Sequence, residues 1–127
     1  MKSILKEIEI KSAYIGNGEW LGLTWRSDRW WVTISRGDNK ITVDFYLGEV
    51  HRGRAPGFVE VLYVLLNNYR AGQNSFEDFC GTFGYDTESR RAFATWEECK
   101  KHREKLGELL SPEEIAQLEI EFADYAK

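Results

Sequence analysis

The chain has 127 residues, a length typical of one domain, of which 43% are apolar and 30% are charged. This balance excludes global disorder, and the longest apolar run, Val61–Leu66, is far shorter than the roughly 18 residues that a membrane span needs. The formal net charge is −4, and residues 1–55 sum to +2 whereas residues 56–127 sum to −6. We therefore expect any contact with nucleic acid to come from the first half.

Alternating apolar and polar residues in the first half predict an antiparallel sheet of three to four strands. Residues 4–11 place Ile8 and Ile10 on one side, as in a half-buried strand. Gly16-Asn17-Gly18 has the composition of a turn, and Leu21–Trp25 is a candidate for a further short strand.

The clearest local pattern is a β-hairpin. Residues 30–35 and 41–47 alternate on either side of Arg36-Gly37-Asp38-Asn39-Lys40, whose Gly, Asp and Asn tolerate positive φ. Trp30 and Trp31 are consecutive in the first of these strands, so their side chains must point to opposite faces. If one of them faces the core, the other lies on the solvent side or under a covering segment.

The periodicity changes to that of helices in the second half, and four helices are expected. The first helix is expected to start at Pro56 and end at Gly72, and the second to start at Ser75 and end at Gly84. The third should be capped by Asp86 or Thr87 and end near Leu110, and the fourth should start at the capping box Ser111–Glu114. Strands followed by helices predict an α+β fold with the helices packed on one face of the sheet. We expect a single domain covering residues 1–127.

Residues 77–86 read Glu-Asp-Phe-Cys-Gly-Thr-Phe-Gly-Tyr-Asp. This segment resembles a motif of small proteins encoded by phages and prophages, whose function is unassigned. The resemblance implies a mobile-element origin and an accessory role, such as interference with a host defence or modulation of replication. The residues themselves favour a structural interpretation, in which Gly84 ends one helix, Tyr85 packs in the elbow and Asp86 caps the next helix.

Few residues are arranged for catalysis or metal binding. Cys99 and His102 have ligand-like spacing, but Cys80 and His51 stand alone, so a zinc site is not expected. Both cysteines fall in apolar helical patterns and are expected to be reduced core residues. No nucleophile elbow or phosphate-binding loop is present, and we expect no enzyme activity and no cofactor. The opening residues lack the apolar core of a secretion signal, so we expect a cytoplasmic protein of a bacterial host.

The most suggestive feature is a cluster of aromatic and basic residues. Four of the five tryptophans lie within twelve residues, from Trp20 to Trp31, with arginines between them. Together with the basic loop that follows the hairpin, they form the expected partner-binding set: Trp25, Arg26, Arg29, Trp31, Arg36, His51, Arg52 and Arg54. An exposed Trp beside Arg is typical of a protein hot spot and also of a platform that stacks single-stranded nucleic acid. A third interpretation is that the tryptophans are simply buried, with Arg covering their edges.

The sequence thus favours a non-enzymatic binding protein that modulates or blocks a host protein, for example as an inhibitor of a defence system. The alternatives are a module that binds single-stranded nucleic acid through the same sheet face, and an unrecognised enzyme. The oligomeric state is left open.

Overall fold

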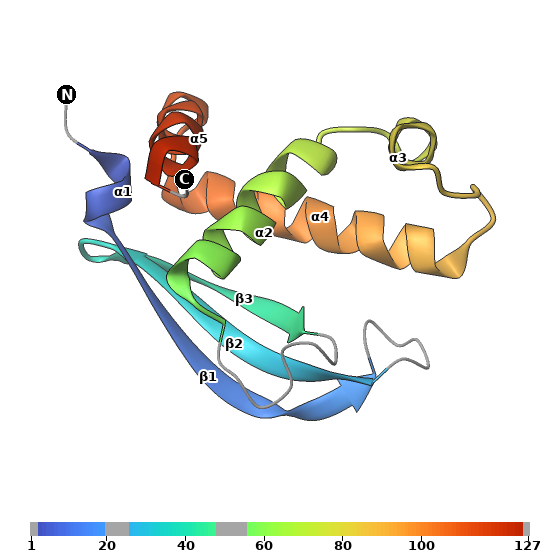
Figure 1. The fold of residues 1–127 in the computed structure, drawn as a ribbon, viewed down its shortest axis with the longest axis horizontal. Coiled ribbons are helices and arrows are strands. Elements are labelled where there is room, and N and C mark those ends of the chain that lie inside the picture. The colour runs from blue at the N-terminus through green and yellow to red at the C-terminus, as the bar shows by residue number, and fades with distance from the viewer. Residues whose placement is uncertain (1–2, 20–25, 48–55, 126–127) are drawn as a thin grey trace.

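The computed structural model describes residues 3–19, 26–47 and 56–125 (Figure 1). A three-stranded antiparallel sheet precedes four helices, and a short helix precedes the sheet, so the predicted α+β class is confirmed. None of the helices in these ranges is long and apolar enough to cross a membrane. The elements are α1 (Ile4–Glu7), β1 (Ile8–Glu19), β2 (Arg26–Arg36), β3 (Asn39–Leu47), α2 (Phe58–Ala71), α3 (Phe76–Phe83), α4 (Arg90–Leu109) and α5 (Pro112–Tyr125).

The predicted hairpin forms between β2 and β3. Arg36 lies opposite Asn39, so the turn consists of Gly37 and Asp38. Gly37 has φ +61°, a left-handed conformation that glycine adopts without steric cost. The strand order is β1-β2-β3, which makes β3 an outer strand of the described sheet.

The turn predicted at Gly16-Asn17-Gly18 is wrong. These residues lie inside the long strand β1, whose pairing with β2 shifts register between Tyr14 and Gly16. Gly16 has φ +131°, and an extra residue in such a strand is a β-bulge. The glycines therefore bend a strand and do not reverse the chain. The short strand predicted at Leu21–Trp25 lies outside the described residues.

The strand predicted for residues 4–11 is also partly wrong, because residues 4–7 form the helical turn α1. The Ser3 hydroxyl caps this turn by accepting a hydrogen bond from the Lys6 N–H. Glu121 of α5 accepts hydrogen bonds from the Ser3 hydroxyl and the Ile4 N–H. A carboxylate from the far end of the chain thus stabilises this helical turn. The residue pattern at positions 4–11 cannot reveal this long-range contact.

The helices α2, α4 and α5 cover one face of the sheet (Figure 1). Between them lies the main core, which draws on every element except α3. Its fully buried residues are Val32, Ile34, Val61, Leu62, Leu65, Leu106, Ile115 and Leu118. Within residues 3–19, 26–47 and 56–125, no helix lies on the opposite face of the sheet (Figure 1).

The helix α3 packs on α4, away from the sheet (Figure 1). Phe79, Cys80 and Cys99 are buried there in a second, smaller cluster, with Tyr85 stacked on Phe79 at 5.6 Å between ring centroids. Gly84 has φ +75° and ends α3 as predicted.

The helix starts are only partly as predicted. Ser75 and Ser111 cap α3 and α5, and the Ser111–Glu114 capping box is closed by two hydrogen bonds of 2.9 and 3.2 Å. However, α4 is capped by Ser89, not by Asp86 or Thr87. Asp86 instead accepts a hydrogen bond from the Glu88 N–H at 2.9 Å, which forms a turn before the helix.

The helix α2 begins at Phe58, two residues after the predicted Pro56. Gly57 occupies the N-cap position, and its N–H donates to the Glu60 carboxylate at 3.3 Å.

Candidate functional site

The outer face of the sheet carries the candidate site, because no helix covers it in Figure 1. Trp30 faces the core and is 8% exposed, whereas its neighbour Trp31 points the other way and is 42% exposed. The prediction that these two tryptophans occupy opposite faces is confirmed. Register and alternation place the following residues on the outer face with Trp31: Glu9, Lys11, Ala13, Arg29, Thr33, Ser35, Lys40, Thr42 and Asp44.

Three side chains meet at Trp31. The Arg29 guanidinium carbon lies 5.9 Å from the centroid of the Trp31 ring, within the range of a cation–π contact. The same guanidinium pairs with both carboxylate oxygens of Asp44, at 3.2 and 3.3 Å. Asp44 lies directly across from Trp31 in the β2–β3 register. Strand pairing therefore orients the indole, the cation and the carboxylate as one group.

A cavity of about 360 Å³ adjoins this group. Trp31 and the β3 residues Thr42, Val43 and Asp44 line one side, and α4 lines the other. The α4 residues are Glu98, Lys101, His102, Glu104 and Lys105. Their spacing does place residues 98, 101, 102 and 105 on one side of a helix, but nothing in the sequence indicates that β3 lies opposite them.

His102 of α4 lies in the buried contact between α4 and β3. It is buried, with 3% of its surface exposed. Its Nδ1 lies 2.8 Å from the Asn68 amide nitrogen, and its Nε2 lies 3.2 Å from the Asp44 carbonyl oxygen. Because an amide nitrogen only donates, Nδ1 accepts, and Nε2–H donates to the carbonyl. Burial lowers the pKa of His102 below its ordinary 6.5, so the neutral ring is favoured.

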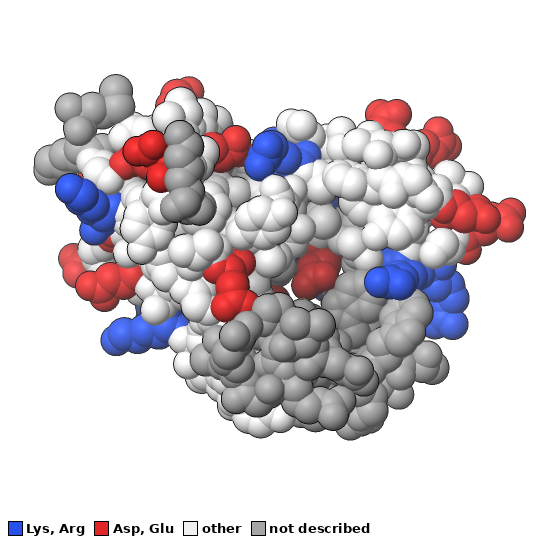
Figure 2. All heavy atoms as spheres, in the orientation of Figure 1, with Lys and Arg blue, Asp and Glu red and all other residues white. Residues whose placement is uncertain are grey.

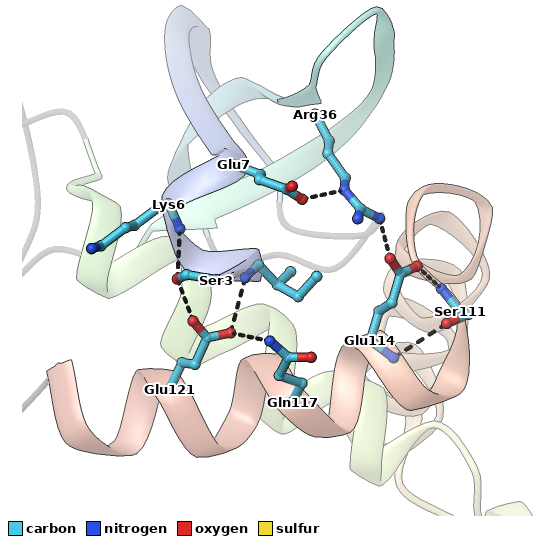
Figure 3. A network of polar contacts seen from close by, with 9 residues as sticks. Ser3, Lys6, Glu7, Arg36, Ser111, Glu114, Gln117 and Glu121 are labelled. Carbon is cyan, nitrogen blue, oxygen red and sulfur yellow. Dashed lines mark hydrogen bonds and ion pairs between the residues drawn. The ribbon is translucent and has the colours of Figure 1, made fainter. Parts of the chain in front are cut away.

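Arg36 forms two ion pairs within the fold. Its Nε lies 2.9 Å from Glu7, and its Nη1 lies 2.5 Å from Glu114 (Figure 3). These partners, led by the Glu114 hydrogen bond, raise the pKa of Arg36. The hydrogen bond from the Ser111 N–H, assisted by Arg36, lowers the pKa of Glu114. Arg36 thereby links β2, α1 and the start of α5, and its role in partner binding stays a prediction.

The remaining predicted site residues divide into two groups. Trp25, His51, Arg52 and Arg54 lie outside the described residues. The Arg26 backbone pairs with Glu19 at the start of β2, but its side chain is not among those described. Only Arg29 and Trp31, of the eight, are brought together by the described contacts.

The two cysteines lie in the interior of the fold. Both are buried free thiols. Desolvation by burial raises the pKa of Cys99 to about 12, and burial also raises the pKa of Cys80. The Cys99 thiol donates to the Asn68 side-chain oxygen at 3.4 Å. Within residues 3–19, 26–47 and 56–125, no group of three or more His, Cys, Asp or Glu is placed to hold a metal ion.

These features define an α+β protein with an exposed aromatic group on the face of its sheet opposite the described helices. No family model, curated protein or solved structure matches the chain.

Proposed function

We propose that the chain is a non-enzymatic binding protein of phage or mobile-element origin, which docks on a host protein through the outer sheet face around Trp31 and blocks or modulates it. The exposure of Trp31 is the observation that carries this proposal, since 42% of a large aromatic side chain is left open beside a buried neighbour. Exposed Trp flanked by Arg is the pattern of an interface hot spot. The resemblance of Glu77–Asp86 to phage-encoded proteins supports the origin and the type of partner.

The chemistry of the titratable groups around the site favours binding over catalysis. Both ring nitrogens of His102 have partners within the fold. A general base needs a free nitrogen to take a proton from a substrate. The cysteine thiols are buried, with raised pKa values, so they are held as thiols and not as nucleophilic thiolates.

The charges near Trp31 favour a protein over a single-stranded nucleic acid. Asp44, Glu98 and Glu104 lie together with Lys101 and Lys105 in the lining of the cavity next to the indole, so this lining is not the uniformly basic surface that phosphate groups favour. Figure 2 shows acidic and basic side chains interspersed over the described part of the face in view.

Affinity capture from a bacterial lysate tests the proposal. The wild-type chain should recover one stoichiometric partner, and Trp31→Ala should abolish that recovery. Tyr63→Ala is the matched control, because Tyr63 is a 62% exposed aromatic residue on α2. Recovery that survives Trp31→Ala, or that is lost equally with Tyr63→Ala, argues against this docking face. Binding of short oligonucleotides that weakens steeply with salt would favour the nucleic-acid alternative.

A further inference from the structure

The two edges of the sheet differ in how their backbone groups are used. At the β3 edge, the Asp44 carbonyl accepts a hydrogen bond from His102 at 3.2 Å, so α4 covers part of that edge. The other outer strand is β1, and within residues 3–19, 26–47 and 56–125 its one strand partner is β2. An outer strand with unpaired N–H and C=O groups is a template on which another strand can pair. The β1 edge is therefore the place where the sheet can be extended.

The register identifies the β1 groups that point away from the sheet. In an antiparallel pair, a residue turns its N–H and C=O together, toward the neighbouring strand or away from it, and the direction alternates along the strand. The Asp44 carbonyl reaches His102 and so points away from β2. Trp31, opposite Asp44, therefore directs its groups toward Ala13 of β1. Alternation then leaves the N–H and C=O groups of Ile8, Ile10 and Ser12 at the outer edge.

The charges on either side of Ile10 favour a second copy of the chain as the added strand. Glu9 and Lys11 are exposed and lie on the outer face of the sheet. If two copies pair antiparallel about a two-fold axis at Ile10, Glu9 of each copy lies opposite Lys11 of the other. Opposite charges in directly opposed positions stabilise strand pairing, whereas like charges destabilise it. An axis at Glu9 or at Lys11 would set like charges against each other, so the charge pattern selects Ile10.

The side chain and backbone of Ile10 suit this central position. The side chain is only partly buried and packs against the main core. Directly opposed residues have their side chains on the same face, so the two Ile10 side chains would lie next to each other. Their N–H and C=O groups face the outer edge, which allows the two copies to exchange a pair of hydrogen bonds there.

We propose that residues 8–12 of β1 pair antiparallel with the same residues of a second copy, with Ile10 on the two-fold axis. The two described sheets then join into one sheet, and both outer faces lie on the same side with Trp31 exposed on each. The inference is independent of the proposed docking function, because it uses an edge of the sheet and not the group around Trp31. The paired segment is short, so we expect a weak dimer with a dissociation constant on the order of 10–100 µM.

Sedimentation velocity of the full chain tests this pairing at low salt and at concentrations up to ~0.5 mM, above the expected dissociation constant. The wild-type chain should show a dimer fraction that rises with concentration. Glu9→Lys and Lys11→Glu each place like charges opposite each other, so each should raise the dissociation constant at least about ten-fold. An equimolar mixture of the two variants should associate again, because every opposed pair then has opposite charges. Both residues are exposed, so neither change should disturb the fold.

Lys40→Glu is the matched control, since it makes the same charge change at an exposed residue of β3 and should leave the dimer unchanged. Three results would overturn the inference: a wild-type chain that stays monomeric up to ~0.5 mM, a mixture of the variants that does not associate, or an equal loss of dimer in Lys40→Glu. None of these results bears on capture of a host protein through Trp31, so the two proposals fail separately.

Discussion

The imidazole of His102 donates a hydrogen bond to the backbone carbonyl of Asp44 at 3.2 Å, and this contact ties α4 to the outer strand of the sheet. In an outer strand, alternate residues turn their N–H and C=O groups away from the sheet. The helix thus satisfies one of these groups through a buried side chain. Directly across the strand, the Asp44 carboxylate holds Arg29 next to Trp31. One β3 residue therefore connects the core contact to the exposed site.

The His102 contact predicts a pH dependence of stability. The pKa of His102 in the folded chain is lowered from 6.5, so the unfolded chain binds a proton at a higher pH than the folded chain does. The contribution of the neutral ring is complete above pH 6.5 and is lost as the pH falls below it, by up to about 1.4 kcal/mol per pH unit.

Urea unfolding between about pH 7.5 and 5.5 measures this dependence. His102→Gln should be less stable at neutral pH but should lose less stability on acidification. The other histidine, His51, is kept in both proteins, so their difference isolates His102. Parallel pH curves for the two proteins would show that His102 titrates normally.

The position of Gly72, where α2 ends next to α4, leaves no room for a larger side chain. A Cβ atom at this position would lie 2.7 Å from the Cys99 carbonyl oxygen and 2.9 Å from the Cys99 carbonyl carbon. Since backbone atoms cannot easily move aside, Gly72→Ala should destabilise the fold by about 1–3 kcal/mol.

Gly107 in α4 is the matched control, because a Cβ atom there would meet nothing within 4 Å. Gly107→Ala should stabilise the protein by about 0.5–1 kcal/mol through helix propensity. Chemical denaturation measures the stability of both variants. If Gly72→Ala were as stable as Gly107→Ala, the close packing of α2 on α4 would be contradicted.

The cap of α4 predicts a difference between two neighbouring hydroxyl residues. Ser89 accepts a hydrogen bond from the Ala92 N–H at 3.1 Å, so Ser89→Ala should cost about 0.5–2 kcal/mol. Thr87 is exposed and does not cap α4, and Thr87→Ala should change the free energy of unfolding by about 0.5 kcal/mol or less. If Thr87→Ala lowered the free energy of unfolding more than Ser89→Ala, the helix would instead start at Thr87, as the sequence predicted.

The two adjacent tryptophans should differ sharply in their contributions to stability. Trp30→Ala removes a buried indole from the core and should cost about 3–5 kcal/mol. Trp31→Ala removes a side chain that is 42% exposed and should cost about 1 kcal/mol or less. Similar losses from the two changes, measured by urea unfolding, would mean that Trp31 is also needed for the fold and is a poor candidate for a docking residue.

The sequence predicted the features that depend on local periodicity and on short capping motifs. The hairpin, the opposite directions of Trp30 and Trp31, and the caps at Ser75 and Ser111 all follow from residues close together in the chain. The bulge at Gly16 was not predicted, because the local sequence around a glycine in a β-bulge resembles the local sequence around a glycine in a turn.

Long-range contacts explain the other errors. Residues 4–7 lead into the alternating residues 7–11 and were predicted as part of the same strand, but Glu121, more than a hundred positions away, accepts hydrogen bonds at the start of α1 (Figure 3). The sequence did not indicate the burial of His102, because its hydrogen-bond partner, the Asp44 carbonyl, lies 58 positions away on β3. The cavity next to Trp31 was likewise hidden, because its two walls come from β3 and α4.

The role of Trp31 as the docking anchor is tested most directly in the complex with the captured partner. The chain labelled with 5-fluorotryptophan gives separate ¹⁹F signals for Trp31 and for Trp96, which packs in the small cluster beside α3. On addition of the purified partner, the Trp31 signal should shift or broaden while the Trp96 signal stays unchanged. A Trp96 signal that changes while the Trp31 signal does not would contradict the account.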